Sequence, residues 1–415
     1  MPPGGGYDGG MDASTPSAVS PRSQLATSIV PWLLIGAIGW GFLLVLGASM
    51  LSTRPATAGF DLELLLDAGR RVAAGQSPYD PSLVGGGAVD APSLFYSYPP
   101  PVAQGMRLVA ALPSWFVLVA WGIGASAAFA AVAVAIARRI GRRDSGGALA
   151  VPVLAIAPFV FPYAIGLLFG NLNVWFPALY GLILLAGVAP AGSAGAIGGV
   201  ALGVVSVAKL HPASLGVWFL VRGPAERRVA AIAGLTIGAI VVASLLVGGF
   251  APWAEYVSVV RAGAAADVVD SRNAGPAATI ALLSGMTGSS VGLLQALVTV
   301  GSVGLTAWAA RSRRDPVESL AWAAAASLVT LPVTWFHYPS ALLPFAVAAI
   351  ARAPLVGAEA VRRTTLLAAA AILVGIIAIA ATPLIWVAIA LVIAAVHESA
   401  RSRPGTPPKV ALRRA

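Results

Sequence analysis

The chain has 415 residues, of which 58% are hydrophobic and only 10% are charged. Soluble domains carry about 25% charged residues, so this composition excludes a water-soluble protein and predicts a polytopic membrane protein. The net charge of +10 does not indicate nucleic-acid binding, because the basic residues stand in short loops between apolar segments. The absence of cysteine excludes disulfides, thiolate metal ligands and a cysteine nucleophile. Lysine is almost missing, which is typical of a GC-rich bacterial genome such as an actinobacterial one.

Apolar segments recur along the chain at about the 20-residue length that a membrane-spanning helix needs. The first is too long for the apolar core of a signal peptide and predicts a retained anchor. A Gly- and Pro-rich tail at 1–28 and a basic tail at 398–415 flank a transmembrane domain at 29–397. Both tails are expected to be disordered in the cytoplasm, the basic one in contact with anionic membrane lipid. About twelve spans are predicted in this all-α domain: 29–52, 114–137, 148–168, 173–190, 193–208, 211–222, 229–249, 289–310, 317–334, 338–352, 364–381 and 383–397.

The Lys and Arg residues of the short loops predict the orientation. Arginines cluster at 138–143, 222–228, 311–314 and 352–363, which are alternate loops of the predicted topology. The positive-inside rule places these loops and both termini in the cytoplasm of a bacterial plasma membrane. The other loops, of which 53–113 is the longest, then face the periplasm or cell envelope.

The first outer loop opens with an amphipathic helix, because Leu62, Leu65 and Leu66 follow helical spacing. This apolar face can lie on the membrane or on neighbouring helices. Asp61 stands in the first turn, where two interpretations compete. Aspartate is a favoured N-cap residue, and it is also the carboxylate that a general base needs beside a substrate hydroxyl. Asp61 and Glu63 diverge on a helix, so a metal bound by both is not favoured.

The sequence Lys209-Leu-His211-Pro212 stands between two unusually short apolar segments. Discontinuous helices that meet at a binding site occur in membrane transporters, and Pro212 suits the first turn of a new helix. The free N–H groups of that helix and the charge of Lys209 would attract a phosphate. The alternative is a lysine that snorkels to the interface.

Further polar and aromatic residues fall at the same predicted face of the membrane. Each has a structural alternative, such as turn formation for Asn or interfacial anchoring for a histidine beside tryptophan. Their convergence on one rim with Asp61 and Lys209 predicts a single binding site, to which no metal is assigned. The set is Tyr79, Asp80, Tyr98, Asn171, Asn173, Arg272, Asn273, His337 and Tyr338.

The motifs that carry a family resemblance stand in a fixed order along most of residues 29–396. They are Phe60-Asp61, Gly75-x-x-Pro78-Tyr79-Asp80, Tyr98-Pro99-Pro100, Gly170-Asn171-x-Asn173, Lys209-x-x-Pro212, Asn273 and Trp335-x-His337-Tyr338. In this order they resemble glycosyltransferase family 87, polytopic mannosyltransferases of the GT-C fold class.

The resemblance implies an inverting transferase that moves mannose from a polyprenyl-phosphate donor to a lipid-linked glycan at the outer face, in glycolipid biosynthesis of the phosphatidylinositol mannoside or lipomannan type. Asp61 is then the base, and Lys209, His211, Arg272 and His337 face the donor. No cofactor is implied. A GT-C transferase of another sugar such as arabinose, a lipid or sugar transporter, and a non-catalytic envelope scaffold stay open as alternatives. Sugar, acceptor, linkage and oligomeric state are not specified by the sequence.

Overall fold

The computed structural model describes residues 21–53, 58–85, 95–141, 150–267, 270, 272–352, 362–363, 365–367, 369–371 and 384–401. In these ranges every regular element is a helix, which confirms the all-α prediction. Most of the predicted span 364–381 and most of both predicted tails lie outside the described residues.

Five described helices are long and apolar enough to cross a membrane: α1 (Pro21–Thr53), α5 (Ser114–Ile140), α11 (Pro224–Gly248), α14 (Ser289–Ser312) and α18 (Leu384–Arg401). A sixth candidate is a bent pair, Ala150–Phe159 with Phe161–Phe169, whose halves meet at 76°. These spans confirm a polytopic membrane character. The prediction of about twelve spans and of the GT-C fold goes further than these spans and stays a prediction.

Helix boundaries differ from the predicted spans at both ends of the chain. Helix α1 begins at Pro21, inside the predicted tail 1–28, and α18 continues to Arg401, past the predicted end at 397. Hydropathy marks only the apolar part of a helix, whereas backbone hydrogen bonding continues into polar sequence.

Shorter helices pack between the long ones and form the core. They are η4 (Leu172–Trp175), α8 (Phe176–Val188), α9 (Ser193–Ala208), η5 (His211–Ser214), α10 (Leu215–Arg222), α15 (Pro316–Ser327), η6 (Tyr338–Leu342) and α16 (Leu343–Ala351). Helix α9 packs closely on α11, because a Cβ atom at Gly199 or Gly203 would lie within 3 Å of α11 atoms. The glycine series of α9 therefore lets two helix backbones approach each other.

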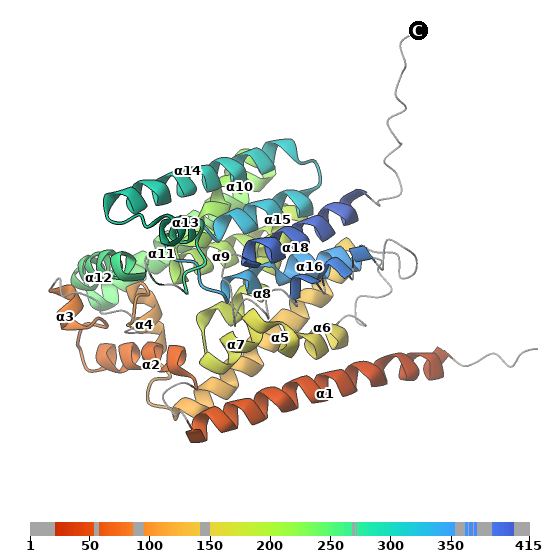
Figure 1. Ribbon diagram of the computed structural model, residues 1–415, viewed down its shortest axis with the longest axis horizontal. Helices are drawn as coiled ribbons and strands as arrows, with labels where there is room; N and C mark the ends of the chain where they lie inside the picture. The colour runs from red at the N-terminus through yellow and green to blue at the C-terminus, as the bar shows by residue number, and fades with distance from the viewer. Residues whose placement is uncertain are drawn as a thin grey trace, which may run out of the picture.

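One end of the bundle carries a layer of short helices (Figure 1). This layer contains α2 (Phe60–Ala73), α3 (Pro81–Val84), α4 (Pro100–Met106) and α12 (Ala251–Asp267). The apolar face of α2 is buried, with Leu62, Leu65 and Leu66 at most 1% exposed, and it packs with residues of α4 and α12. The amphipathic helix predicted in the loop 53–113 is thus confirmed, and its apolar face is covered by protein.

Helix α12 and the following α13 (Pro276–Ser284) were not predicted, because α12 is too polar to read as a span. Neither helix meets the length and hydropathy of a spanning segment. Both belong to the 250–288 loop, and they return the chain to the bundle at α14.

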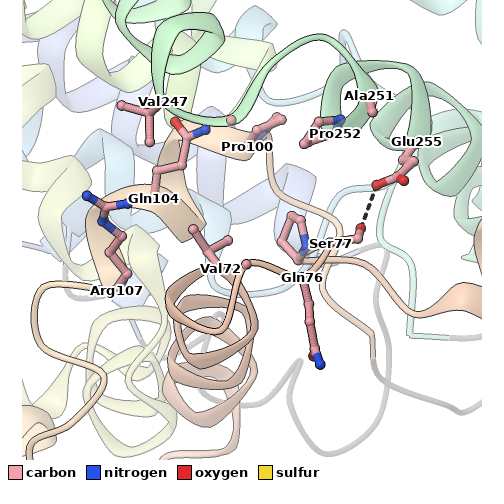
Figure 2. Close-up of a pocket in the computed structure, with 13 residues that line it drawn as sticks. Val72, Gln76, Ser77, Pro100, Gln104, Arg107, Val247, Ala251, Pro252 and Glu255 are labelled. Atoms are coloured by element: carbon pink, nitrogen blue, oxygen red, sulfur yellow. Dashed lines mark hydrogen bonds between the residues drawn. The ribbon is translucent and has the colours of Figure 1, made fainter.

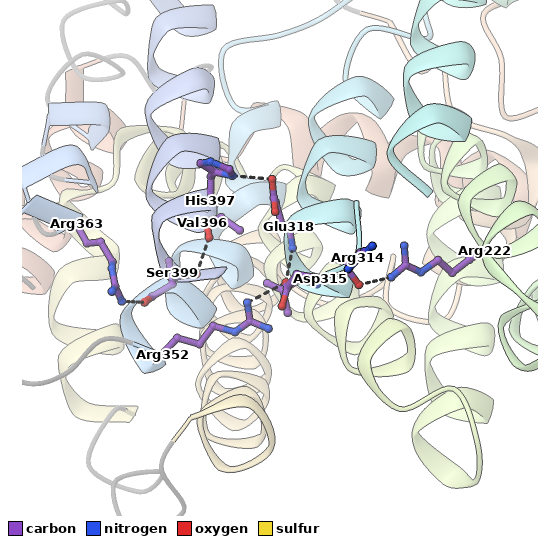
Figure 3. A network of polar contacts seen from close by, with 11 residues as sticks. Arg222, Arg314, Asp315, Glu318, Arg352, Arg363, Val396, His397 and Ser399 are labelled. Atoms are coloured by element: carbon purple, nitrogen blue, oxygen red, sulfur yellow. Dashed lines mark hydrogen bonds and ion pairs between the residues drawn. The ribbon is translucent and has the colours of Figure 1, made fainter. Parts of the chain in front are cut away.

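The opposite end of the bundle holds the start of α1, the end of α18 and a network of polar contacts (Figures 1 and 3). Asp315 caps α15 by accepting the N–H groups of Val317 and Glu318, and it also pairs with Arg352 at 2.9 Å. The Glu318 carboxylate forms an ion pair with the Arg313 guanidinium at 3.0 Å, and it makes a hydrogen bond with His397 Nδ1 at 2.8 Å. The network ties α14, α15, α16 and α18 together at the end farthest from α2.

Candidate active site

Asp61 projects from the second residue of α2, and it does not cap the helix. The N-cap position belongs to Gly59, whose φ of 70° only glycine adopts readily, and no side chain caps α2 there. The Gly59 N–H donates to the Leu168 carbonyl at 2.8 Å, which fixes the start of α2 against α7 (Phe161–Phe169). The N-cap interpretation of Asp61 is therefore wrong, and its carboxylate is left for another function.

Asn171 contacts the Asp61 carboxylate directly. Its Nδ2 donates to Asp61 Oδ2 at 2.6 Å, while its Oδ1 accepts the Asn173 N–H at 2.8 Å. Gly170 makes this approach possible, since it has a φ of 67° and a Cβ atom there would lie 2.5 Å from Leu62 Cβ. The turn at Gly170-Asn171-x-Asn173 therefore packs against α2 and fixes the orientation of the Asp61 carboxylate.

Lys209 lies at the break between α9 and η5, in extended conformation with φ −144° and ψ 135°. Its Nζ atom stands 4.3 Å from the Tyr338 ring centroid and 5.5 Å from that of Tyr98. Its charge acts on Asp61, and the Asp61 charge acts on it. Among the described residues, however, Lys209 has no ion pair within 4.0 Å. Residues 61 and 209 are thus neighbours, with space between their charges.

Aromatic rings form one wall beside Lys209. His211 stacks on Tyr338 with centroids 5.0 Å apart and planes at 20°, and Phe176 contacts His211 at 5.7 Å. The ring centroids of His337 and Tyr338 are 5.3 Å apart. Phe176 was not predicted, because an apolar residue in a span gives no sequence signal for a site. Cation–π contacts with such rings hold an ammonium group in place without neutralising it.

Three buried polar side chains in this region carry atoms without a hydrogen-bond partner among the described residues. His211 is 1% exposed, and neither of its ring nitrogens makes a hydrogen bond. Asn173 is 1% exposed, and neither its Oδ1 nor its Nδ2 atom makes a hydrogen bond. His337 is 7% exposed and its Nε2 atom is likewise unpaired. Buried polar groups are nearly always satisfied in proteins, so these atoms are candidates for ligand contacts.

Burial shifts the pKa values of Asp61, Lys209 and Tyr98. It raises the pKa of Asp61 above its ordinary value of 3.8, although the Asn171 hydrogen bond and the charge of Lys209 oppose the shift. Burial also lowers the pKa of Lys209, opposed by Asp61. The Tyr98 pKa is raised by burial and by the Asp61 charge, so its hydroxyl stays protonated. A carboxylate with a raised pKa is better suited to accept a proton near neutral pH.

Four other predicted site residues have structural contacts in the described chain. The Tyr79 hydroxyl donates to the Tyr98 carbonyl at 2.9 Å, and Asp80 caps α3 through the Ser82 N–H. Arg272 pairs with Asp270, which lowers the pKa of that carboxyl. Asn273 joins its loop to Pro332 and Thr334 through its side-chain amide. Their predicted contacts with substrate stay predictions.

Among the described residues, no group of three or more His, Asp or Glu side chains could hold a metal ion. The residues that the structure brings together are Asp61, Tyr98, Asn171, Asn173, Lys209, His211, His337 and Tyr338. We call this set the α2–η5 cluster. It combines a candidate base, a cation and unpaired amide and imidazole atoms.

The fold and this cluster define a polytopic helical membrane protein with a concentrated polar site beside the first turn of α2. The model of glycosyltransferase family 87 matches residues 96–334, more than half of the chain. The chain therefore belongs to glycosyltransferase family 87, and the protein is a glycosyltransferase that uses a sugar donor and an acceptor. No curated protein matches the chain. Asn171, Lys209 and His211 fall inside the matched region, whereas Asp61 and His337 lie outside it.

Proposed function

We propose that the protein transfers mannose from a polyprenyl-phosphate donor to a lipid-linked glycan at the outer face of a bacterial plasma membrane, with inversion at the anomeric carbon. The observation that carries this proposal is that the α2–η5 cluster holds the Asp61 carboxylate, bonded to Asn171, near the Lys209 ammonium group, which lies against the Tyr338 and Tyr98 rings. A base for the acceptor and a cation for the leaving phosphate are the two groups that such a reaction needs.

Asp61 is proposed as the general base. It takes the proton of the acceptor hydroxyl while the hydroxyl oxygen forms a bond to the anomeric carbon and the bond from that carbon to the phosphate oxygen breaks. Polyprenyl phosphate leaves with the bonding electrons. Asn171 Nδ2 donates a hydrogen bond to Asp61 Oδ2 and so fixes the orientation of the carboxylate. Oδ1 of Asp61 is the oxygen proposed to take the proton.

Lys209 is proposed to stabilise the charge that develops on the departing phosphate. Tyr338 and Tyr98 hold its ammonium group by ring contacts, which leave the full positive charge available to a ligand. His211 lies beside it in the aromatic stack. We assign His337 and Asn173 to sugar hydroxyls or donor oxygens, because both carry unpaired buried atoms.

Arg272, Asn273, Tyr79 and Asp80 are proposed as supporting residues at the same face. Arg272 is 48% exposed at its side chain and lies 5.7 Å from the Trp335 ring, two residues before His337. It is therefore placed to approach a donor phosphate from the loop side. A lipid-borne donor suits a site at the membrane, where a soluble sugar nucleotide is not expected.

The decisive experiment incubates purified protein with radiolabelled polyprenyl-phosphate-mannose and a panel of glycolipid acceptors. Transfer of label to one acceptor by the wild type, and its loss in Asp61→Asn, is the expected result. Absence of transfer to every acceptor, with movement of the donor across proteoliposome membranes, would identify a transporter instead. Replacement of the donor by polyprenyl-phosphate-arabinose tests the other sugar.

Orientation is tested separately with reporter fusions. A fusion at Ser271, between α12 and α13 in the sequence, is expected outside, and a fusion at Arg313, which pairs with Glu318 in the polar network, is expected inside. The two reporters must give opposite readings. Equal readings would overturn the proposed location of the site.

A further inference from the structure

Four tyrosine rings contact one another in a row that leads from α12 to Lys209. The ring centroids of Tyr256 and Tyr79 are 6.2 Å apart, and those of Tyr79 and Tyr96 are 5.6 Å apart. The Tyr96 and Tyr98 centroids follow at 5.7 Å, and Lys209 Nζ lies 5.5 Å from the Tyr98 centroid. We call these four residues the tyrosine row. It joins the layer of short helices to the α2–η5 cluster.

Tyr79 is held in the row through each of its polar groups. Its N–H donates to the Ser77 hydroxyl at 3.1 Å, and its carbonyl accepts a hydrogen bond from Arg71 Nη1 at 2.6 Å. Its own hydroxyl donates to the Tyr98 carbonyl at 2.9 Å. Tyr79 is also 0% exposed, so it presents no surface to a substrate. The group on which its hydroxyl acts is the backbone of Tyr98.

The turn that carries Tyr79 is anchored to α12. Figure 2 shows the Ser77 hydroxyl, which donates a hydrogen bond to the Glu255 carboxylate of that helix. The turn begins at Gly75, whose φ of 72° favours glycine. Hydrogen bonds to charged groups are among the stronger ones in proteins, so the contact with Glu255 fixes the turn and with it the direction of the Tyr79 side chain.

Tyr98 is the member of the row that reaches the Lys209 ammonium group. Burial lowers the pKa of Lys209, which favours the neutral amine. A ring face attracts an ammonium group and favours its charged form, so the contacts with Tyr98 and Tyr338 oppose the effect of burial. The position of the Tyr98 ring therefore bears on the charge of Lys209. The other titratable groups that interact electrostatically with Lys209 are Asp61, His211 and His337.

We propose that Tyr79 is a positioning residue for Lys209, which acts through its hydrogen bond to the Tyr98 backbone and touches neither substrate. The Tyr98 ring is thereby held against the ammonium group, which stays charged and directed at the leaving phosphate. This inference rests on the proposed function for the part that Lys209 plays in the reaction. It gives the motif Gly75-x-x-Pro78-Tyr79 a function: the turn places Tyr79, Tyr79 places Tyr98, and Tyr98 places Lys209.

The Lys209 side chain can be observed directly, because the chain has only two lysines, Lys209 and Lys409. Lysine labelled with ¹³C at Cε in the Lys409→Arg protein gives one NMR signal, whose position reports the ring contacts and whose titration reports the charge. In Tyr79→Phe this signal should move towards that of a solvated lysine. Its titration midpoint should fall by up to roughly 1 pH unit, as a cation–π contact weakens. Tyr163→Phe is the matched control, because the Tyr163 hydroxyl is also buried and bonded, to Ser126 at 3.1 Å, but lies outside the row.

Transfer assays then connect this position to turnover. Tyr79→Phe should lower kcat/KM for the donor roughly three- to tenfold, the value of one neutral hydrogen bond, and leave the acceptor KM unchanged. In the Lys209→Ala background the same substitution should have little effect, because the group that it positions is gone. Equal losses in both backgrounds would show that Tyr79 acts on turnover by another route and would overturn the inference.

The NMR signal separates this inference from the proposed function. If the signal and its midpoint in Tyr79→Phe match those of Tyr163→Phe, Tyr79 does not position Lys209, and mannose transfer by the wild type still supports the proposed function. If the signal moves as expected but the wild type transfers no mannose, the positioning of Lys209 stands and the proposed function fails. Should Tyr79→Phe aggregate, Ser77→Ala replaces it with the same two outcomes, because it releases the same turn from α12.

Discussion

The α2–η5 cluster and the polar network of Figure 3 are both rich in charged or polar side chains, but their bonding differs. In the network, Arg352 pairs with Asp315 and Arg313 with Glu318, and Arg222 donates to the carbonyls of Ala310 and Arg314. In the cluster, Lys209 has only ring contacts at short range, and the Asn173 amide is unpaired among the described residues.

This difference separates structural from functional polarity. A network in which opposite charges form ion pairs with one another holds helix ends together and leaves few charges for a ligand. A cluster whose buried groups lack partners costs stability, and proteins tolerate that cost chiefly where a ligand completes the contacts. Changes in the cluster should therefore affect turnover, and changes in the network should affect stability.

The largest effect is expected from Asp61→Asn. The amide cannot take a proton from the acceptor, so turnover should fall by roughly 10²- to 10⁴-fold, the usual contribution of general base catalysis. The measurement is transfer of label from polyprenyl-phosphate-mannose, with the amount of folded protein determined by size-exclusion chromatography. Asp315→Asn serves as the matched control in the network and should keep its turnover per folded molecule. A rate near that of the wild type in Asp61→Asn would exclude Asp61 as the base.

Loss of the ion pair between Arg352 and Asp315 should lower the stability of the protein and leave the turnover of the folded molecules unchanged, the reverse of Asp61→Asn. The Arg352 side chain is 3% exposed and that of Asp315 is 12% exposed, so Arg352→Met leaves a carboxylate that is largely buried without this partner. Breaking a buried pair from one side costs about 3 to 5 kcal/mol. Thermal unfolding in detergent should show this loss, while Asp61→Asn shows none of similar size. An unchanged melting temperature in Arg352→Met would mean that the network does not stabilise the bundle.

The five long spans that the structure describes could be predicted because hydropathy carries that information, whereas the prediction of about twelve spans stays a prediction. Asp61, Asn171 and Lys209 were predicted at one rim, and the structure brings them together although 148 positions separate the first from the last. Sequence could not show that Gly59, rather than Asp61, occupies the N-cap position of α2, because the folded backbone sets that position. Nor could it show that Arg272 is paired with Asp270.

A hollow of about 350 Å³ beside α4 could not be predicted at all. Its lining residues come from three separate parts of the chain, and only Gly75, Pro78 and Pro100 among them stand in a recognised motif. Helix α12, which contributes Glu255, was not predicted, because it is too polar for a membrane span. Tertiary packing alone brings these residues into one concave site.

A smaller effect is expected from Lys209→Ala. Removal of the charge should weaken use of the donor by roughly ten- to a hundredfold in kcat/KM, the value of a hydrogen bond to a charged group. The acceptor KM should change little, because Asp61 and α2 stay in place. Kinetics across a donor titration measure the effect. Unchanged donor kinetics would show that Lys209 does not contact the phosphate and would support the snorkelling alternative.

The smallest effect, and the sharpest test of the Asp61–Lys209 pair, is the pH dependence of kcat/KM. Asp61 must be deprotonated to accept a proton, so activity should fall as the pH drops through its raised pKa, above the ordinary 3.8. Lys209 must be protonated to stabilise phosphate, so activity should also fall as the pH rises through its lowered pKa, below the ordinary 10.5. The profile should thus be bell-shaped. Lys209→Arg carries a guanidinium that stays charged throughout, so it should remove the alkaline limb and keep the acidic one. An alkaline limb that persists unchanged in Lys209→Arg would assign that titration to another group.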